Sequence, residues 1–89
     1  MNGRLQRVGE QSAAYIEKSL LMMDVQKGQY FSLNAMATRI WELLEHPITQ
    51  EDLVGKLLVE YEVTEEVCRA EVGTFLAELR KHELLGDVA

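Results

Sequence analysis

The hydrophobic period of the chain changes at Asn34, and this change limits the possible folds more than any other feature. In residues 29–33 polar and apolar side chains alternate, with Phe31 and Leu33 on one face, as in a half-buried β-strand. From Ala35 onward apolar residues recur at the 3.6-residue spacing of an α-helix, and Asn34 is a residue type that favours the cap position before a helix. A strand therefore leads directly into a helix, and both must share one core.

Two more strand-like segments precede this junction. Residues 12–16 and 20–23 are short and apolar, and the charged residues 17–18 separate them. Asp24 opens and Gly28 closes the next turn, where glycine adopts a positive φ at little cost. Two short connections predict an antiparallel meander, with the middle segment at its centre and the other two at its edges.

Three helices are predicted after the strands. The first begins near Ala35 and ends before Pro47, because proline disfavours helical geometry in the preceding residue. The second follows Thr49, which can cap a helix and has Asp52 at the third helical position. The third begins at Thr64, where a cap is again available. Its predicted core positions are Cys68, Val72, Phe75 and Leu79, flanked by Val67 and Leu76. The predicted order is βββααα, an α+β domain.

The chain has 89 residues, enough for one small domain. Residues 1–10 show no clear period and are predicted to form a flexible N-terminal arm, with room for a short strand around residues 5–8, whereas residues 11–86 form the domain. No apolar run exceeds four residues, and a membrane span needs about 20, so neither a membrane partner nor a signal peptide is expected. The lone Cys68 fits a reducing, cytoplasmic compartment.

The charges are distributed unevenly. Residues 1–34 carry four basic and three acidic side chains, whereas residues 35–89 carry five basic and twelve acidic ones. An acidic helical half is poorly suited to phosphate backbones, which bind mainly through Lys and Arg, so no nucleic-acid partner is expected. The sequence has no glycine-rich phosphate loop and no Cys/His cluster with metal-ligand spacing. We therefore expect no cofactor, no metal and no catalytic residue, and a protein that binds rather than an enzyme.

Several conspicuous side chains have a simpler role in the core. Trp41 follows the helical spacing of the first helix and is predicted to be buried. Cys68 lies on the apolar side of the third helix and is predicted to be a small buried hydrophobe, because no motif places a base beside it. Met22 and Met23 are predicted to be strand core. Tyr30 faces away from Phe31, so either a solvent-exposed or a binding role is open to it.

An ordered set of residues extends over roughly positions 12–85. Its members are Asp24, Gly28, Tyr30, Phe31, Leu33, Asn34, Ala37, Ile40, Trp41, Glu42, Leu43, Leu44, Thr49, Asp52, Leu53, Val54, Tyr61, Glu71, Val72, Phe75, Leu76, Leu79, Leu84 and Leu85. No single member is diagnostic, but the set at these spacings resembles the PqqD-like family, the peptide-binding domains known as RiPP recognition elements. One departure is Glu83, where the family commonly has glycine at the end of the last helix.

The resemblance implies a winged-helix-turn-helix-like fold that binds the leader segment of a ribosomally made precursor peptide and presents it to modifying enzymes. In that family the leader adds as an extra strand beside the third strand and lies against the third helix. A free-standing chain of this size is similar to the discrete members of the family, which include PqqD itself. The pair Ile40-Trp41 and the tyrosine-rich third strand look more like the recognition proteins of lasso-peptide pathways, whose partner is a leader peptidase. The alternative is a PqqD-type peptide chaperone for a radical-SAM enzyme in pyrroloquinoline quinone or related biosynthesis.

The residues themselves are compatible with this binding mode. An edge strand presents unpaired N–H and C=O groups to a peptide, and side-chain pockets must then supply specificity. On the third helix, a stripe next to the predicted core is expected to line the groove, with Leu76 as its floor and Arg69 or Arg80 meeting an acidic leader residue. The predicted peptide-binding residues are Gln29, Tyr30, Phe31, Ser32, Leu33, Arg69, Val72, Gly73, Leu76 and Arg80.

Two other functions stay open at this point. A winged-helix fold can bind DNA, but residues 64–82 carry three basic against four acidic side chains, which is unusual for a recognition helix. A purely structural subunit of an enzyme complex is the third possibility.

Overall fold

The structure of the protein is a computed structural model, which describes residues 3–88. Three strands, β2 (Gln11–Ile16), β3 (Ser19–Asp24) and β4 (Gln29–Leu33), form the predicted antiparallel meander, and β3 is its central strand. The turn before β4 has the predicted chemistry. The side chain of Asp24 accepts hydrogen bonds from the backbone N–H groups of Gln26 and Lys27, and Gly28 has a φ of 66°.

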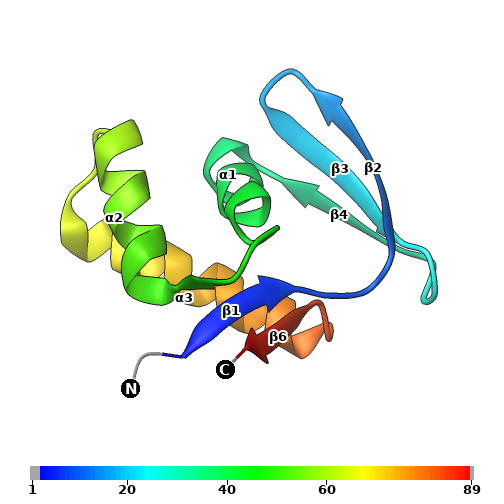
Figure 1. The fold of residues 1–89 in the computed structure, drawn as a ribbon. Coiled ribbons are helices and arrows are strands. Elements are labelled where there is room, and N and C mark those ends of the chain that lie inside the picture. Colours follow the sequence, from blue (N-terminus) through cyan, green and yellow to red (C-terminus); the bar gives the residue numbers. More distant parts are fainter. Residues whose placement is uncertain (1–2, 89) are drawn as a thin grey trace.

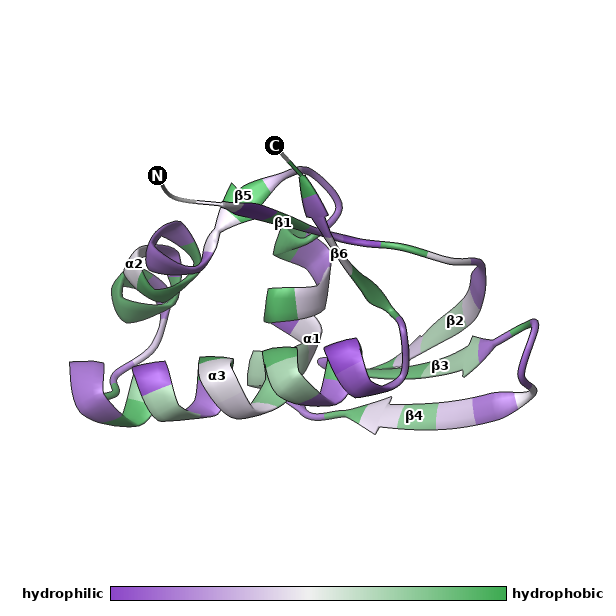
Figure 2. Ribbon diagram, turned by 90° about the horizontal axis from the view of Figure 1, so that it is seen from below, coloured by the Kyte–Doolittle hydropathy of each residue, from purple (hydrophilic) through white to green (hydrophobic). Residues whose placement is uncertain are grey.

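The three predicted helices follow the meander as α1 (Ala35–Leu43), α2 (Gln50–Glu60) and α3 (Glu65–Lys81). Each begins at the predicted cap, because the side chains of Asn34, Thr49 and Thr64 accept a hydrogen bond from the N–H group three residues later. Figure 1 shows α1 between the sheet and α2, and Figure 2 shows α3 running past both helices toward the sheet. The α+β class is confirmed.

Thr38 fixes α1 to the sheet. Its hydroxyl accepts a hydrogen bond from the N–H group of Leu20 in β3 and donates one to the carbonyl oxygen of Leu33 in β4. Around this junction lies one continuous core drawn from all three helices and both sheets. Its most deeply buried side chains are Met22, Ile40, Leu44, Leu53, Leu57, Leu84, Val54, Val72 and Cys68. Trp41 is also buried, as predicted.

A second small sheet forms that the sequence did not predict, although a short strand around residues 5–8 was allowed and overlaps one of its strands. Strand β1 (Arg4–Arg7) lies between β5 (Ile48–Thr49) and β6 (Leu85–Val88), antiparallel to both. The arm expected over residues 1–10 thus contains a paired strand whose Leu5 is buried, and residues 87–88, which lie beyond the predicted domain, belong to another strand. Each strand is too short to show a period, and its pairing partner lies far away along the chain.

The departure at Glu83 has a structural counterpart at the end of α3. Glu83 has a φ of 62°, in the left-handed region that costs a residue with a Cβ atom about 1–2 kcal/mol. This conformation reverses the chain, so that the N–H group of Leu84 donates to the carbonyl oxygen of Leu79 at 2.8 Å. Glycine would adopt it without the cost, and the reversal directs Leu84 and Leu85 into the core.

No helix within residues 3–88 has the length and hydrophobicity needed to cross a membrane.

Candidate functional site

Strand β4 has a free edge, and its Phe31 contacts His82 at the end of α3. Within the described chain β4 pairs with β3 alone, so the outward N–H and C=O groups of its other edge have no strand partner. Leu33 is buried and Phe31 is half-buried against the core, as predicted, whereas Tyr30 and Ser32 are exposed on the opposite face. The five predicted binding residues of this strand therefore form one continuous edge.

A hollow continues from the end of β4 to the side of α3. It has a volume of about 380 Å³ and is lined by Asn34, Ala37, Glu71, Thr74, Phe75 and Glu78. Asn34 and Ala37 belong to the start of α1, and the other four residues lie on one face of α3 at helical spacing. Ala37 and Phe75 give this hollow an apolar floor, and the two glutamates give it an acidic rim.

At the other end of β4, near the β3–β4 turn, the sheet contacts the end of α3. The Nζ atom of Lys27 lies 2.9 Å from Oε1 of Glu83 and donates a hydrogen bond to the carbonyl oxygen of His82. The rings of Phe31 and His82 meet edge to face, with their centres 4.9 Å apart. A peptide beside β4 would therefore pass over Phe31 and His82 before it reaches the hollow.

The α3 residues predicted to line the groove lie on other sides of the helix. Val72 and Leu76 are buried in the core, at 0% and 6% exposure. A Cβ atom added to Gly73 would meet no atom within 4 Å, so space is open there, but it lies away from the hollow's lining. Cys68, Val72 and Leu79 are buried as predicted, but Leu76 takes the core position predicted for Phe75, and Phe75 lines the hollow instead.

The two predicted arginines already have partners within the protein. Arg69 binds Glu51 of α2 at 2.8 Å and Glu65 of its own helix at 2.8 Å, and Arg80 binds Asp87 of β6 at 3.0 Å. The hydrogen bonds to Arg69 and Arg80 lower the pKa values of Glu51 and Asp87, and those carboxylates raise the pKa of each guanidinium. The wall beside β4 carries glutamates instead, so it is acidic.

Glu71, Thr74 and Glu78 line the hollow beside β4, and sequence reasoning did not select them. The sequence does contain a pattern that includes them, because polar residues at spacings of three and four form an exposed stripe along one side of α3. It could not be told apart from an ordinary solvated helix face.

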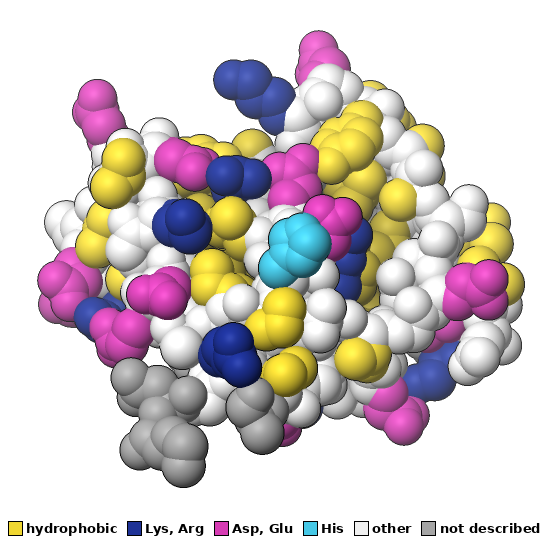
Figure 3. Space-filling view, viewed as in Figure 1, with side chains coloured by type: hydrophobic (Ala, Val, Ile, Leu, Met, Phe, Trp, Pro, Cys, Tyr) yellow, Lys and Arg dark blue, Asp and Glu magenta, His cyan; other side chains and the backbone are white. Residues whose placement is uncertain are grey.

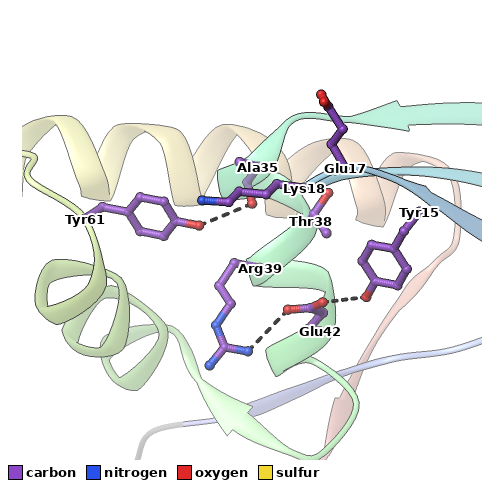
Figure 4. Close-up of a pocket in the computed structure, with 8 residues that line it drawn as sticks. All are labelled: Tyr15, Glu17, Lys18, Ala35, Thr38, Arg39, Glu42 and Tyr61. Atoms are coloured by element: carbon purple, nitrogen blue, oxygen red, sulfur yellow. Dashed lines mark hydrogen bonds and ion pairs between the residues drawn. The ribbon is translucent and has the colours of Figure 1, made fainter.

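A second hollow, of about 280 Å³, lies on the far side of α1 between the β2–β3 hairpin and α2. Figure 4 shows Tyr15, Arg39 and Glu42 facing one another there. The hydroxyl of Tyr15 donates to Glu42, a hydrogen bond that raises the pKa of Tyr15, and Arg39 bridges Glu42 and Glu60. These polar groups satisfy one another, which indicates a structural role.

Among residues 3–88 no group of three or more His, Cys, Asp or Glu side chains is arranged to hold a metal ion. Cys68 is fully buried, and burial raises the pKa of its thiol, as expected for a core position rather than a nucleophile.

Comparison with known proteins places the chain among peptide-binding relatives. The sequence model of the family described as coenzyme PQQ synthesis protein D (PqqD) matches residues 19–85. The structure of TbiB1 in complex with the TbiA(beta) leader peptide is 31% identical, with 94% of this chain and 98% of that chain covered and a TM-score of 0.80. Lasso peptide synthetase B1 complexed with its leader peptide is 23% identical over 92% of this chain and 96% of that one, with a TM-score of 0.75, and its likeness concerns the fold. No curated protein sequence matches significantly.

Proposed function

We propose that this chain, which belongs to the PqqD-like family of RiPP recognition elements, binds the leader segment of a ribosomally made precursor peptide by adding it as a strand to β4. The observation that carries the proposal is the likeness to TbiB1, a protein in complex with a leader peptide, at 31% identity over 94% of this chain. The free β4 edge supports the same conclusion independently of that likeness.

Main-chain pairing alone would bind a leader weakly. Two or three residues of a five-residue strand face outward, each with one N–H and one C=O group, and each hydrogen bond that they form contributes about 1 kcal/mol net. A micromolar complex requires about 8 kcal/mol after the cost of association, so side-chain contacts must supply a large part of the affinity. The hollow at the end of β4 is where we propose that they arise.

The hollow favours an apolar leader side chain with a basic neighbour. Ala37 and Phe75 offer apolar contact, and burial of one Leu-sized side chain there contributes roughly 1.5–3 kcal/mol. Glu71 and Glu78 at the rim favour a lysine or arginine. This replaces the expectation that Arg69 or Arg80 meets an acidic leader residue, because both arginines are held by Glu51, Glu65 and Asp87.

We further propose that the protein delivers the leader to a processing enzyme, and specifically to the leader peptidase of a lasso-peptide pathway. The similar solved structure of a lasso peptide synthetase B1, which shares this fold, supports this branch. The family description supports the second candidate, a peptide chaperone in pyrroloquinoline quinone synthesis. The two predict different partners: a peptidase in the first case and a radical-SAM enzyme in the second.

Fluorescence anisotropy with the labelled leader of the cognate precursor tests the binding proposal. Phe75→Ala should weaken binding about tenfold or more, because it removes the floor of the hollow. The matched control is Val59→Ala, an apolar truncation at a side chain 87% exposed on α2, which should leave the affinity within about twofold. Circular dichroism must show both variants folded. Failure of the wild-type protein to bind the leader, or equal binding by a folded Phe75→Ala variant, would contradict the proposal.

A further inference from the structure

The face of the β2–β3–β4 sheet turned away from the helices is uncharged. The pairing register places Ile16, Leu21, Met23 and Tyr30 on this outer face, and the remaining outward positions of the three strands hold alanine or serine. The exposed fractions of Ile16, Leu21 and Tyr30 are 62%, 39% and 69%. Charged residues make up 27% of the chain, yet this outer sheet face has no charged side chain. A sheet face exposed only to solvent normally carries polar residues, so this face differs from an ordinary solvated surface.

The sequence of the central strand, β3, is also typical of a strand whose outer face is covered. In the middle of β3 the outward residues Leu21 and Met23 are as apolar as the inward residues Leu20 and Met22. A continuous apolar run is typical of a strand covered on both faces, whereas a sheet with one wet face alternates apolar and polar residues. Within the described chain only the inner face of β3 is covered, by α1 and the core.

The outer face also has a concave centre. A hollow of about 200 Å³ lies over the sheet and is lined mainly by Ala14, Leu21, Met23 and Tyr30. Figure 3, which sees this sheet nearly edge-on, shows charged side chains of both signs interspersed with hydrophobic ones over the helices. A single apolar side chain of a partner protein would fit a hollow of this size.

The area of this face argues against a second copy of the chain as its occupant. Three strands about 4.8 Å apart, each about six residues long, give a face of roughly 300 Å². A stable interface buries about 800 Å² on each partner, so self-association through this face alone would be too weak. A stable partner must therefore also contact a surface outside these three strands.

The face continues directly onto the proposed leader site. Tyr30 and Ser32 belong to the outer face, and they also lie in the strand whose free edge is proposed to take the leader. An added strand would extend the sheet, and every second leader side chain would then project from the same outer face. Sheet and leader together would present one larger surface to a third molecule.

Resting on the proposed leader binding, we propose that this outer sheet face, called the apolar sheet face below, docks the enzyme that processes the leader. That enzyme contributes an uncharged, apolar surface with one side chain seated in the hollow between Leu21 and Tyr30. It contacts the bound leader at the same time, so the leader-bound protein is its preferred partner.

The test uses the protein, its cognate leader peptide and the leader peptidase that processes the same precursor, with enzyme binding measured by biolayer interferometry. Leu21→Lys places a charge at the centre of the apolar sheet face without touching the β4 edge. Ala14→Lys, at the position opposite Leu21 on β2, is a second variant in case the first fails to fold. Val59→Lys on α2 is the matched control, because it makes the same kind of change at an exposed apolar residue elsewhere.

We expect Leu21→Lys or Ala14→Lys to weaken enzyme binding at least about tenfold while leader affinity stays within about twofold, and Val59→Lys to change neither. Unchanged enzyme binding by a folded sheet-face variant that still binds the leader would overturn this inference alone. Loss of leader binding by the wild-type protein would instead overturn the proposed function. A wild-type dimer in light scattering that Leu21→Lys converts to a monomer would assign the face to a second copy and also overturn the inference.

Discussion

At the scale of single residues, Glu71 and Glu78 determine the charge of the groove. Both side chains are exposed, and Glu78 has one weak contact, 3.8 Å from Nε2 of His82. No hydrogen bond or ion pair engages Glu71 within residues 3–88. Arg69, in contrast, donates hydrogen bonds to the carboxylates of Glu51 and Glu65. Arg80 donates two hydrogen bonds to the carboxylate of Asp87. The charges available to a bound peptide are therefore negative.

Leader peptides with a single lysine or glutamate at the positions facing the hollow should reveal this charge. The lysine peptide should bind about two- to fivefold more tightly in low salt, a range set by exposed ion pairs. Glu78→Lys should reverse the preference. Glu66→Lys, on the same helix but more than about 100° around it, is the control and should leave the preference unchanged. A preference for the glutamate peptide would show that the bound peptide contacts Arg69 or Arg80 instead.

The same residues explain what the sequence could and could not predict about the site. The alternation in β4 and the cap at Asn34 predicted the edge strand, and the structure has both. Which of Phe75 and Leu76 faces the core could not be predicted, because the two are adjacent, both are large and apolar, and either can face a core. Packing against α1 and α2 selects Leu76, which is 6% exposed, and leaves Phe75 half-buried at the groove.

At the scale of elements, β1 shows how a segment without a local signal becomes structure. Its four residues pair with β6 along their whole length and with β5 at one end. The N–H group of Arg7 also donates to the carbonyl oxygen of Leu44, and the Arg7 guanidinium lies 5.2 Å from the centre of the Trp41 ring. None of these contacts is local, so a period of two over four residues could not reveal them.

Leu5→Ala should therefore destabilise the protein by about 2–4 kcal/mol, because Leu5 is 7% exposed and its truncation leaves a cavity in the core. Chemical denaturation followed by Trp41 fluorescence or circular dichroism measures this change. Ile16→Ala, at a side chain 62% exposed, is the matched control and should change stability by less than about 0.5 kcal/mol. Equal stability of both variants would mean that residues 1–10 are the flexible arm that their composition suggests.

At the scale of the whole molecule, ion pairs join elements that the two sheets do not connect. Arg39 of α1 binds Glu60 at the end of α2 through Nε at 2.8 Å, and Arg69 joins α3 to α2. The hydrogen bond to Arg39 lowers the pKa of Glu60 below its usual value of 4.5. A carboxyl group with a lowered pKa in the folded state stabilises the protein above its unfolded pKa, and that contribution is lost as the pH falls through the folded value.

The difference in melting temperature between the wild-type protein and Arg39→Gln should follow this rule. It should be constant above about pH 5 and shrink toward zero at lower pH, because protonated Glu60 no longer gains from Arg39. Differential scanning calorimetry over a pH series measures it, and the comparison cancels the effect of the other carboxylates. A difference that already shrinks between about pH 7 and pH 6 would point to a histidine instead.

Three features of the whole molecule adjoin β4: its own free edge, the acidic face of α3 and the apolar sheet face. The central claim is that a leader peptide pairs with that strand. Leader peptides methylated at one backbone nitrogen at a time test it most directly, because alternate N–H groups of an added strand face β4 and the others face away. We predict that affinity falls about fivefold or more at every second position along the bound segment and stays nearly unchanged between them. A uniform loss, or no loss at any position, would contradict strand addition at β4.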